Sequence, residues 1–282
     1  MKKIFLNHAF GKKIRFPHKF ANYKYKIPYV FKLSGNNQNV TFLGCEHLKN
    51  ATNAKNKELE NFVRKIIEKN KKKLFIVTEE EFVKSGFLPR LTKKYRIPIF
   101  SCDPSNKELI SLVISLKKFK KEYILLWIFL NILNQFSKSN KLDNPSIIKA
   151  KNNIKTASKL LGINFSFKKL TTLFKKETGF EFCEKLNFKK IKELQDPFKT
   201  GSILNRVGSA INNTRDRIMF FCVVQKILSG HSGIVIFGHN HIYAQEPAYK
   251  TLFKELKRGA SQNATRSPIF RISRRLFRIL PR

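Results

Sequence analysis

Two stretches of the chain decide its predicted fold: residues 233–241 read GIVIFGHNH, and residues 40–47 read VTFLGCEH. In each, a short β-rich run ends in Gly-x-x-His, and we expect the glycine to let the chain turn sharply off the strand. The run Ile234–Phe237 is continuously apolar, which is typical of a strand buried on both faces of a sheet. Because ligands bind at the carboxyl ends of strands in open α/β sheets, we expect His47 and His241 at one rim.

The rest of the chain alternates short strand patterns with longer helical patterns, which predicts an α/β fold. The expected strands are Tyr29–Leu33, Val40–Gly44, Leu74–Thr78, Ile97–Phe100 and Gly233–Gly238. Helical periodicity covers residues 57–69, 106–116, 121–136 and 207–228. We therefore predict a mostly parallel central sheet flanked by helices, with a helical insertion at about 140–200 that shows no strand pattern.

Charge divides the 282 residues into three parts. The chain has 57 Lys and Arg against 19 Asp and Glu, a net charge of +38, yet its 42% hydrophobic content excludes wholesale disorder. All the acids lie between Glu46 and Glu255. We predict a basic N-terminal extension at 1–24, the α/β domain at 25–258 and an Arg-rich C-terminal tail at 259–282.

So large a positive charge implies an anionic partner, and RNA or a ribosome is favoured over an anionic membrane surface. Aromatic residues stand among the bases at both ends of the chain, at Phe16, Phe20, Tyr23, Tyr25, Phe270 and Phe277, as base stacking requires. The predicted nucleic-acid contacts are Arg258, Arg266, Arg271, Arg274, Arg275 and Arg278. AT-rich coding DNA is an alternative source of the Lys excess, but it would remove Arg rather than concentrate it.

The sequence predicts no membrane span and no secretion. The longest apolar run, Tyr123–Leu133, is too short to cross a bilayer, and the run at Ile4–Leu6 is too short for a signal peptide. The acid-free N-terminus fits either an organelle presequence or a basic arm. The cysteines, which lie far apart without a CxxC motif, are Cys45, Cys102, Cys183 and Cys222. We expect reduced thiols, and so a cytoplasmic or organellar-matrix location.

Two further residues are placed to join the two histidines. Glu79 directly follows the strand pattern Leu74–Thr78 and would face the same crevice if the three strands are neighbours. Its alternative role is to open a helix together with Glu80 and Glu81. Arg215 lies in the long helix before the last strand, where it could stabilise an oxyanion or stand as an ordinary surface base.

These residues allow two chemistries. His47, Glu79, His239 and His241 could hold a divalent metal ion that activates water, and His239 and His241 would point the same way in an extended segment. Alternatively, Glu79 could orient His47 or His241 as a general base, with Arg215 facing an oxyanion. The residues alone do not choose between the two.

The ordered set Gly44-x-x-His47, Glu79, Arg215 and Gly238-x-x-His241 resembles a known superfamily. It includes TraB-domain proteins, the TIKI metalloproteases, the heme-binding lipoprotein ChaN and the erythromycin esterases. The resemblance is greatest to bacterial TraB-like proteins, which have a sequence segment similar to residues 234–252, IVIFGHNHIYAQEPAYKTL. Arg215-Asp216-Arg217 resembles their Arg-Asp pair, and the match covers roughly residues 25–258.

The resemblance implies a crevice in which His47, Glu79, Arg215 and His241 converge, in a family that hydrolyses esters or peptide bonds, some members with a divalent metal. The sequence departs from the family where Glu79 is followed by two more glutamates instead of two glycines. Glu46 lies one position away from the acid of the esterase branch, which would turn it to the other side of an extended segment.

Two functions follow from the sequence. The first is a TraB-like hydrolase, either with a divalent metal, as in some relatives, or without one, acting on an unknown ester, amide or peptide. The alternative is a catalytically retired scaffold that binds RNA through its basic ends, for example on a ribosome or an organellar ribosome.

Overall fold

The computed structural model describes residues 10–261, apart from 22, 25, 36–37, 47–52, 71–73, 85–86, 116, 136–143, 165 and 183–185. The chain divides into two compact units. We call the first the sheet unit, which consists of residues up to 15, residues 23–104 and residues from 215 onward. We call the second the helical unit, which consists of residues 16–22 and 105–214.

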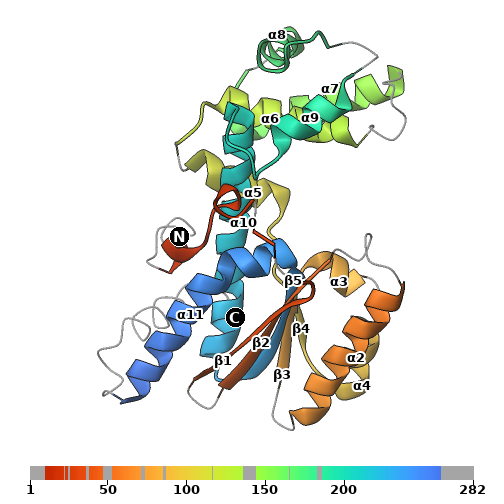
Figure 1. The fold of residues 1–282 in the computed structure, drawn as a ribbon. Coiled ribbons are helices and arrows are strands. Elements are labelled where there is room, and N and C mark those ends of the chain that lie inside the picture. Colours follow the sequence, from red (N-terminus) through yellow and green to blue (C-terminus); the bar gives the residue numbers. More distant parts are fainter. Residues whose placement is uncertain are drawn as a thin grey trace. The chain divides into compact units, whose positions relative to one another are not determined.

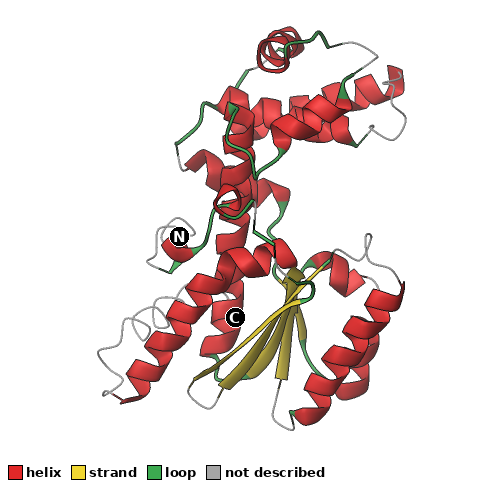
Figure 2. Cartoon of the chain, in the orientation of Figure 1, coloured by secondary structure: helices red, strands yellow, loops and turns green. Residues whose placement is uncertain are grey.

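The sheet unit is built on five strands in the order β1-β2-β5-β3-β4 (Figure 1). Their bounds are β1 Tyr29–Gly35, β2 Gln38–Cys45, β3 Leu74–Thr78, β4 Ile99–Ser101 and β5 Ser232–Gly238. Only β1 and β2 pair antiparallel, as a hairpin, and every other pairing is parallel. With helices flanking the sheet, the predicted α/β class and mostly parallel sheet are confirmed (Figure 2).

Strand β5 occupies the centre of the sheet because every residue from Ser232 to Gly238 is buried. It pairs with β2 on one side, where Cys45 lies opposite Gly238, and with β3 on the other, where Thr78 lies opposite Ile236. The strands before His47, Glu79 and His241 are therefore neighbours, and they end at the same edge of the sheet.

Helices cover both faces of the sheet (Figure 1). On one face, α2 (Asn53–Lys69) and α4 (Leu88–Tyr95) pack on an apolar cluster that includes Leu43, Ile76 and Ile236. On the other face, the Phe42 ring stacks on Phe31 with ring centroids 4.6 Å apart, and it contacts the tilted ring of Tyr249 at 4.3 Å. That face is covered by α11 (His239–Ser261) and by the part of α10 (Ile203–Leu228) that belongs to the sheet unit. Side chains of both helices reach the carboxyl edge of the sheet.

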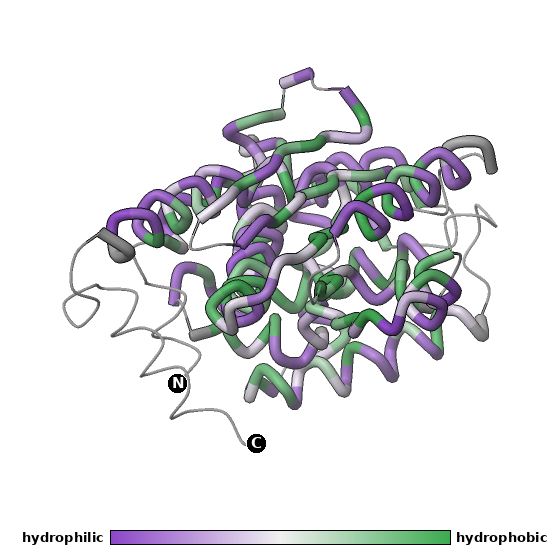
Figure 3. Tube along the Cα trace, turned by 90° about the horizontal axis from the view of Figure 1, so that it is seen from below, coloured by the Kyte–Doolittle hydropathy of each residue, from purple (hydrophilic) through white to green (hydrophobic). Residues whose placement is uncertain are grey.

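The helical unit contains no strand among its described residues. Its helices are α5 Asn106–Ser115, α6 Lys121–Asn134, α7 Asn144–Leu161, α8 Phe167–Thr178, α9 Phe188–Gln195 and the first part of α10. Apolar and polar residues alternate along most of the helices, as Figure 3 shows, so each buries one face. The short elements η1 (Gly11–Lys13) and α3 (Glu80–Lys84) belong to the sheet unit, and η2 (Pro17–Lys19) to the helical unit.

Only one of the two Gly-x-x-His stretches turns as the sequence predicted, because β5 ends at Gly238 and α11 begins at His239. Strand β2 continues through Gly44 to Cys45, so the chain does not leave the strand at this glycine. A Cβ atom at Gly44 would instead lie 2.8 Å from the Cα atom of His239. Glycine is needed here because the start of α11 passes close to the strand.

We expect Gly44→Ala to destabilise the protein by about 1–3 kcal/mol, because the added methyl group meets backbone that cannot move without distorting the sheet. The measurement is urea unfolding followed by circular dichroism. Gly201→Ala is the matched control, since nothing lies within 4 Å of the added Cβ and we expect a change below about 0.5 kcal/mol. Equal unfolding midpoints for the two variants would contradict the close approach.

Candidate functional site

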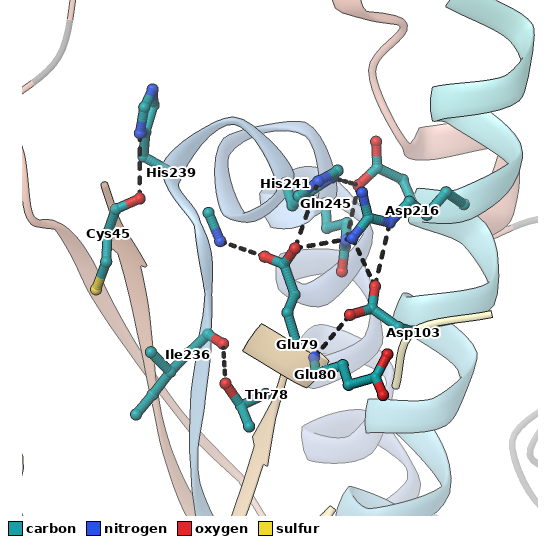
Figure 4. A network of polar contacts seen from close by, with 12 residues as sticks. Cys45, Thr78, Glu79, Glu80, Asp103, Asp216, Ile236, His239, His241 and Gln245 are labelled. Atoms are coloured by element: carbon teal, nitrogen blue, oxygen red, sulfur yellow. Dashed lines mark hydrogen bonds and ion pairs between the residues drawn. The ribbon is translucent and has the colours of Figure 1, made fainter. Parts of the chain in front are cut away.

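Charged side chains from separate parts of the sequence meet at the carboxyl edge of the sheet (Figure 4). Glu79 follows β3, Asp103 lies two residues after β4, and His241 lies in the first turn of α11, after β5. Helix α10 adds Arg215 and Asp216. We call these five residues the charged cluster. They converge because parallel strands end at one edge and the helix passes beside it.

Arg215 joins two of the carboxylates. Its Nη2 donates to Glu79 Oε2 at 2.9 Å and to Asp103 Oδ1 at 2.5 Å, and its Nε donates to Asp103 Oδ1 at 3.2 Å. Asp103 is held in turn, because its Oδ2 accepts the backbone N–H of Glu80 at 2.7 Å. Burial lowers the pKa of Arg215, but the nearby charges of Glu79 and Asp103 outweigh it and raise that pKa above its ordinary value. Arg215 is therefore a fixed cation.

Glu79 is the most deeply buried carboxylate of the cluster, with its side chain 2% exposed. Its Oε1 accepts the backbone N–H of Gly238 at 2.5 Å, and its Oε2 accepts from Arg215. A buried carboxylate is tolerated only when its oxygens have such partners. Glu79 therefore connects the end of β5 to α10.

His241 is buried with both ring nitrogens facing carboxylates. Its Nδ1 lies 2.8 Å from Asp216 Oδ1, and its Nε2 lies 4.0 Å from Glu79 Oε2. Burial lowers the pKa of His241. The charge and hydrogen bond of Asp216, together with the charge of Glu79, raise it by more than burial lowers it. The net effect is a pKa above the ordinary 6.5, so His241 keeps its proton to a higher pH than a free imidazole does.

Arg215 and Asp216 are adjacent in sequence but serve different partners. Successive residues of an α-helix point about 100° apart. Arg215 therefore reaches the ends of β3 and β4, while Asp216 reaches His241. The sequence predicted Glu79 as the partner that orients the histidine, but in the structure the partner at His241 Nδ1 is Asp216.

Sequence reasoning did not select Asp103 or Asp216 as site residues. The available signals were weak ones. Asp103 follows a strand at the same edge as Glu79, and Asp216 stands next to Arg215 in a helix that the sequence already placed beside the site. Neither signal says which way a carboxylate points.

The expectation that His239 and His241 point the same way is wrong. Helix α11 begins at His239, so two residues separate their directions by about 200° instead of aligning them as an extended segment would. The Nδ1 of His239 instead lies 3.2 Å from the carbonyl oxygen of Cys45. Figure 4 shows the two rings on opposite sides of the start of the helix.

The other predicted residues lie elsewhere. His47 falls outside the described residues, as do Arg266, Arg271, Arg274, Arg275 and Arg278. Arg258 lies exposed near the end of α11, 3.1 Å from Glu255. Glu46 lines a small pocket with Cys45, Leu59 and Phe62. Glu80 begins α3, so the helix-opening role applies to Glu80, while Glu79 faces the cluster.

The described residues do not fit a metal site. No group of three or more His, Cys, Asp or Glu side chains among them is arranged to hold an ion. His239 is turned toward Cys45, His241 Nδ1 faces Asp216, and both oxygens of Glu79 accept hydrogen bonds. The Arg215 guanidinium beside Glu79 also disfavours a second cation. The metal hypothesis now depends on His47 and stays a prediction.

The expectation of reduced thiols is wrong for one pair, because Cys102 and Cys222 form a disulfide with their Cα atoms 5.9 Å apart. Cys102 precedes Asp103, and Cys222 lies two helical turns after Arg215. The disulfide therefore joins the same two elements as the Asp103–Arg215 pair. Cys45 is free and buried, and burial raises the pKa of its thiol to about 12, while Cys183 lies outside the described residues.

We expect alkylation of the unreduced protein to leave Cys102 and Cys222 unmodified, with one linked peptide in the digest by mass spectrometry. Reductant should lower the thermal midpoint of the wild type, because the bond closes a loop with a sequence separation of 120. Loop entropy of that size corresponds to about 4–5 kcal/mol. The Cys102→Ser/Cys222→Ser variant should have a low thermal midpoint that reductant does not change. Two alkylated cysteines and a reductant-independent wild type would show that the bond is absent.

No protein-family model, curated protein or solved structure matches the chain. The TraB-like resemblance therefore stays a prediction from the sequence. Among the described residues, no helix has the length and apolar character that crossing a membrane demands.

Proposed function

We propose that the protein is a TraB-like hydrolase of an ester, amide or peptide, with the charged cluster as its active site. The observation that carries the proposal is the contact between His241 Nδ1 and Asp216 Oδ1 at 2.8 Å, with the other ring nitrogen facing Glu79 and Arg215. An imidazole held at one nitrogen by a carboxylate is the arrangement that general-base catalysis needs.

The composition of the chain strengthens this interpretation. The protein has only 19 acidic residues against 57 basic ones, and three of the acids lie in this cluster with one arginine and one histidine. Groups that burial and neighbouring charges perturb together, as at Arg215 and His241, concentrate at functional sites. Removing these charges from water costs free energy, and apolar side chains of similar volume would stabilise the fold without that cost.

The reaction assigns one step to each group. Neutral His241 accepts a proton from water at Nε2, while Asp216 holds the N–H at Nδ1. The water oxygen attacks the carbonyl carbon of the substrate and forms a tetrahedral oxyanion. The proton then passes from His241 to the leaving oxygen or nitrogen as the carbonyl re-forms and the scissile bond breaks.

Arg215 supplies the positive charge for that oxyanion. Its side chain is 30% exposed, and its Nη1 makes no hydrogen bond to any residue that the structure describes. Glu79 and Asp103 hold the other two guanidinium nitrogens in place. A preorganised cation of this kind stabilises developing negative charge without having to reorient.

The location in a cytoplasm or an organellar matrix stays a prediction from the sequence. The Cys102–Cys222 disulfide weighs against a reducing compartment, because lasting disulfides are rare there outside redox-active proteins.

We expect His241→Gln to lower kcat/KM by about 10²- to 10⁴-fold on whichever member of a panel of nitrophenyl esters, anilides and peptides the wild type cleaves. His231→Gln is the matched control, since His231 precedes β5 and His241 follows it.

The activity of the wild type should rise with pH through a midpoint above 6.5. His241 must lose its proton before it can act as a base, and the negative charges of Asp216 and Glu79 favour the protonated form of His241.

The panel is run with chelator and with added divalent metal, which also tests the metal-dependent version. No turnover of any substrate under either condition would overturn the hydrolase proposal. So would a His241→Gln variant as active as His231→Gln.

A second candidate, binding of RNA through a basic surface, is favoured by the exposed side of α11. Lys250, Lys254, Lys257 and Arg258 follow one another there at helical spacing. The η1 segment, with Lys12 and Lys13 exposed, packs against the same helix. Such a row of bases suits a phosphate backbone.

Of the aromatic residues predicted to stack on RNA bases, one is both described and well exposed. Phe20 is buried edge-on against Phe198, and Phe16 packs near His18. Tyr23 is 56% exposed and stacks on Tyr243, with ring centroids 4.6 Å apart. Tyr25, Phe270 and Phe277 lie outside the described residues.

We expect Lys254→Glu/Lys257→Glu to weaken binding of a fluorescent single-stranded RNA and to reduce the slope of log Kd against log salt by about two. The measurement is fluorescence anisotropy of the full-length protein at several salt concentrations. Lys168→Glu/Lys176→Glu on α8 is the charge-matched control. Equal losses in both variants would mean that net charge alone, and no particular surface, attracts the RNA.

A further inference from the structure

A buried chain of hydrogen bonds runs behind His241 along one side of α11. Tyr249 donates its hydroxyl to Gln245 Oε1 at 2.8 Å, and Gln245 Nε2 donates to Asp216 Oδ1 at 2.9 Å. The same Asp216 oxygen lies 2.8 Å from His241 Nδ1. Residues 241, 245 and 249 are four apart, so they follow one another on one face of the helix.

The chain is closed to water along its whole length. Gln245 and Tyr249 are 0% exposed, and Asp216 is 2% exposed. Polar groups at that depth are costly unless each is hydrogen-bonded. An apolar pair of similar size would pack here without any such requirement. The two side chains therefore need an explanation beyond filling the core.

The chemistry of each group gives the chain one direction. Burial, together with the charge of Asp216, raises the pKa of Tyr249 well above its ordinary 10. The phenol therefore stays protonated and donates a hydrogen bond to Gln245. Gln245 must then accept with its oxygen and turn its amide hydrogens toward Asp216. The amide in the opposite orientation would place its oxygen against a carboxylate oxygen. Asp216 accepts from Gln245 and so accepts from His241 as well.

We propose that Gln245 and Tyr249 are positioning residues that hold Asp216 so that neutral His241 carries its proton on Nδ1 and presents the Nε2 lone pair to the charged cluster. The catalytic consequence rests on the proposed hydrolase function, but the assignment of the proton does not. The charged groups that face His241 are Asp216 and Arg215 from α10 and Glu79 from the end of β3. Of these, Asp216 is the one whose orientation Gln245 controls.

The wrong proton position would disable the site. With the proton on Nε2, the nitrogen that faces Glu79 and Arg215 would have no lone pair with which to accept a proton from water. Asp216 alone can rotate about its side-chain bonds. The second hydrogen bond to the same oxygen restrains that rotation, and Tyr249 restrains the amide that makes it.

The test is made on full-length protein labelled with ¹⁵N-histidine, with His241 assigned by its loss in His241→Gln. Long-range ¹H–¹⁵N spectra recorded above the His241 titration report which ring nitrogen is protonated. We expect only the Nδ1–H form in the wild type. In Gln245→Leu and Tyr249→Phe, we expect the Nε2–H form to appear and the His241 titration midpoint to move. Tyr243→Phe, the same change on the same helix without a bond to Gln245, should match the wild type.

Activity gives a separate readout. If the wild type cleaves a substrate, kcat of Gln245→Leu at high pH should fall by about 10- to 100-fold with KM little changed. Folded variants whose His241 tautomer and titration match the wild type would overturn the positioning role, whatever the activity. The wild type with the proton on Nε2 would overturn it too. A shifted tautomer in a protein with no hydrolytic activity would keep the positioning role and reject the hydrolase proposal.

Discussion

The Arg215 guanidinium, held between Glu79 and Asp103, is the interaction on which the rest of the site depends. It ties α10 to the ends of β3 and β4, and Glu79 extends the connection to β5 through the N–H of Gly238. One partly buried cation thus fixes three strand ends and one helix. Removing either carboxylate would leave the remaining charges poorly compensated, because buried ion pairs are tolerated only as complete sets.

The geometry of α10 divides this arrangement into two parts. Arg215 organises the carboxylates at the strand ends, and Asp216, one residue further, organises His241. The Cys102–Cys222 disulfide fastens the same helix to the segment that carries Asp103. Ionic, hydrogen-bonded and covalent contacts therefore all act on the placement of α10 against the sheet. In the proposed hydrolase, the fixed cation would face the oxyanion and the oriented imidazole would serve as the base.

Local patterns in the sequence predicted much of the sheet. Leu74–Thr78 has the bounds that the apolar run indicated, and β5 differs from its prediction by one residue, because a strand buried on both faces is recognisable as a continuous apolar run. The sequence also selected Glu79, Arg215 and His241, which the structure brings together. It failed where direction mattered: His239 was read as part of an extended segment, yet it begins a helix and turns toward Cys45.

By itself, then, the sequence determined the α/β class, the central strands and the chemical types gathered at their ends, since hydropathy and spacing carry that information locally. Only the tertiary structure decided that Asp216 orients His241, that Gln245 and Tyr249 stand behind it, and that Cys102 meets Cys222. These contacts join β4, α10 and α11, which lie far apart along the chain. Their partners are set by the packing of the helices on the sheet and by the helical phase of each side chain, and neither can be read from a local stretch of residues.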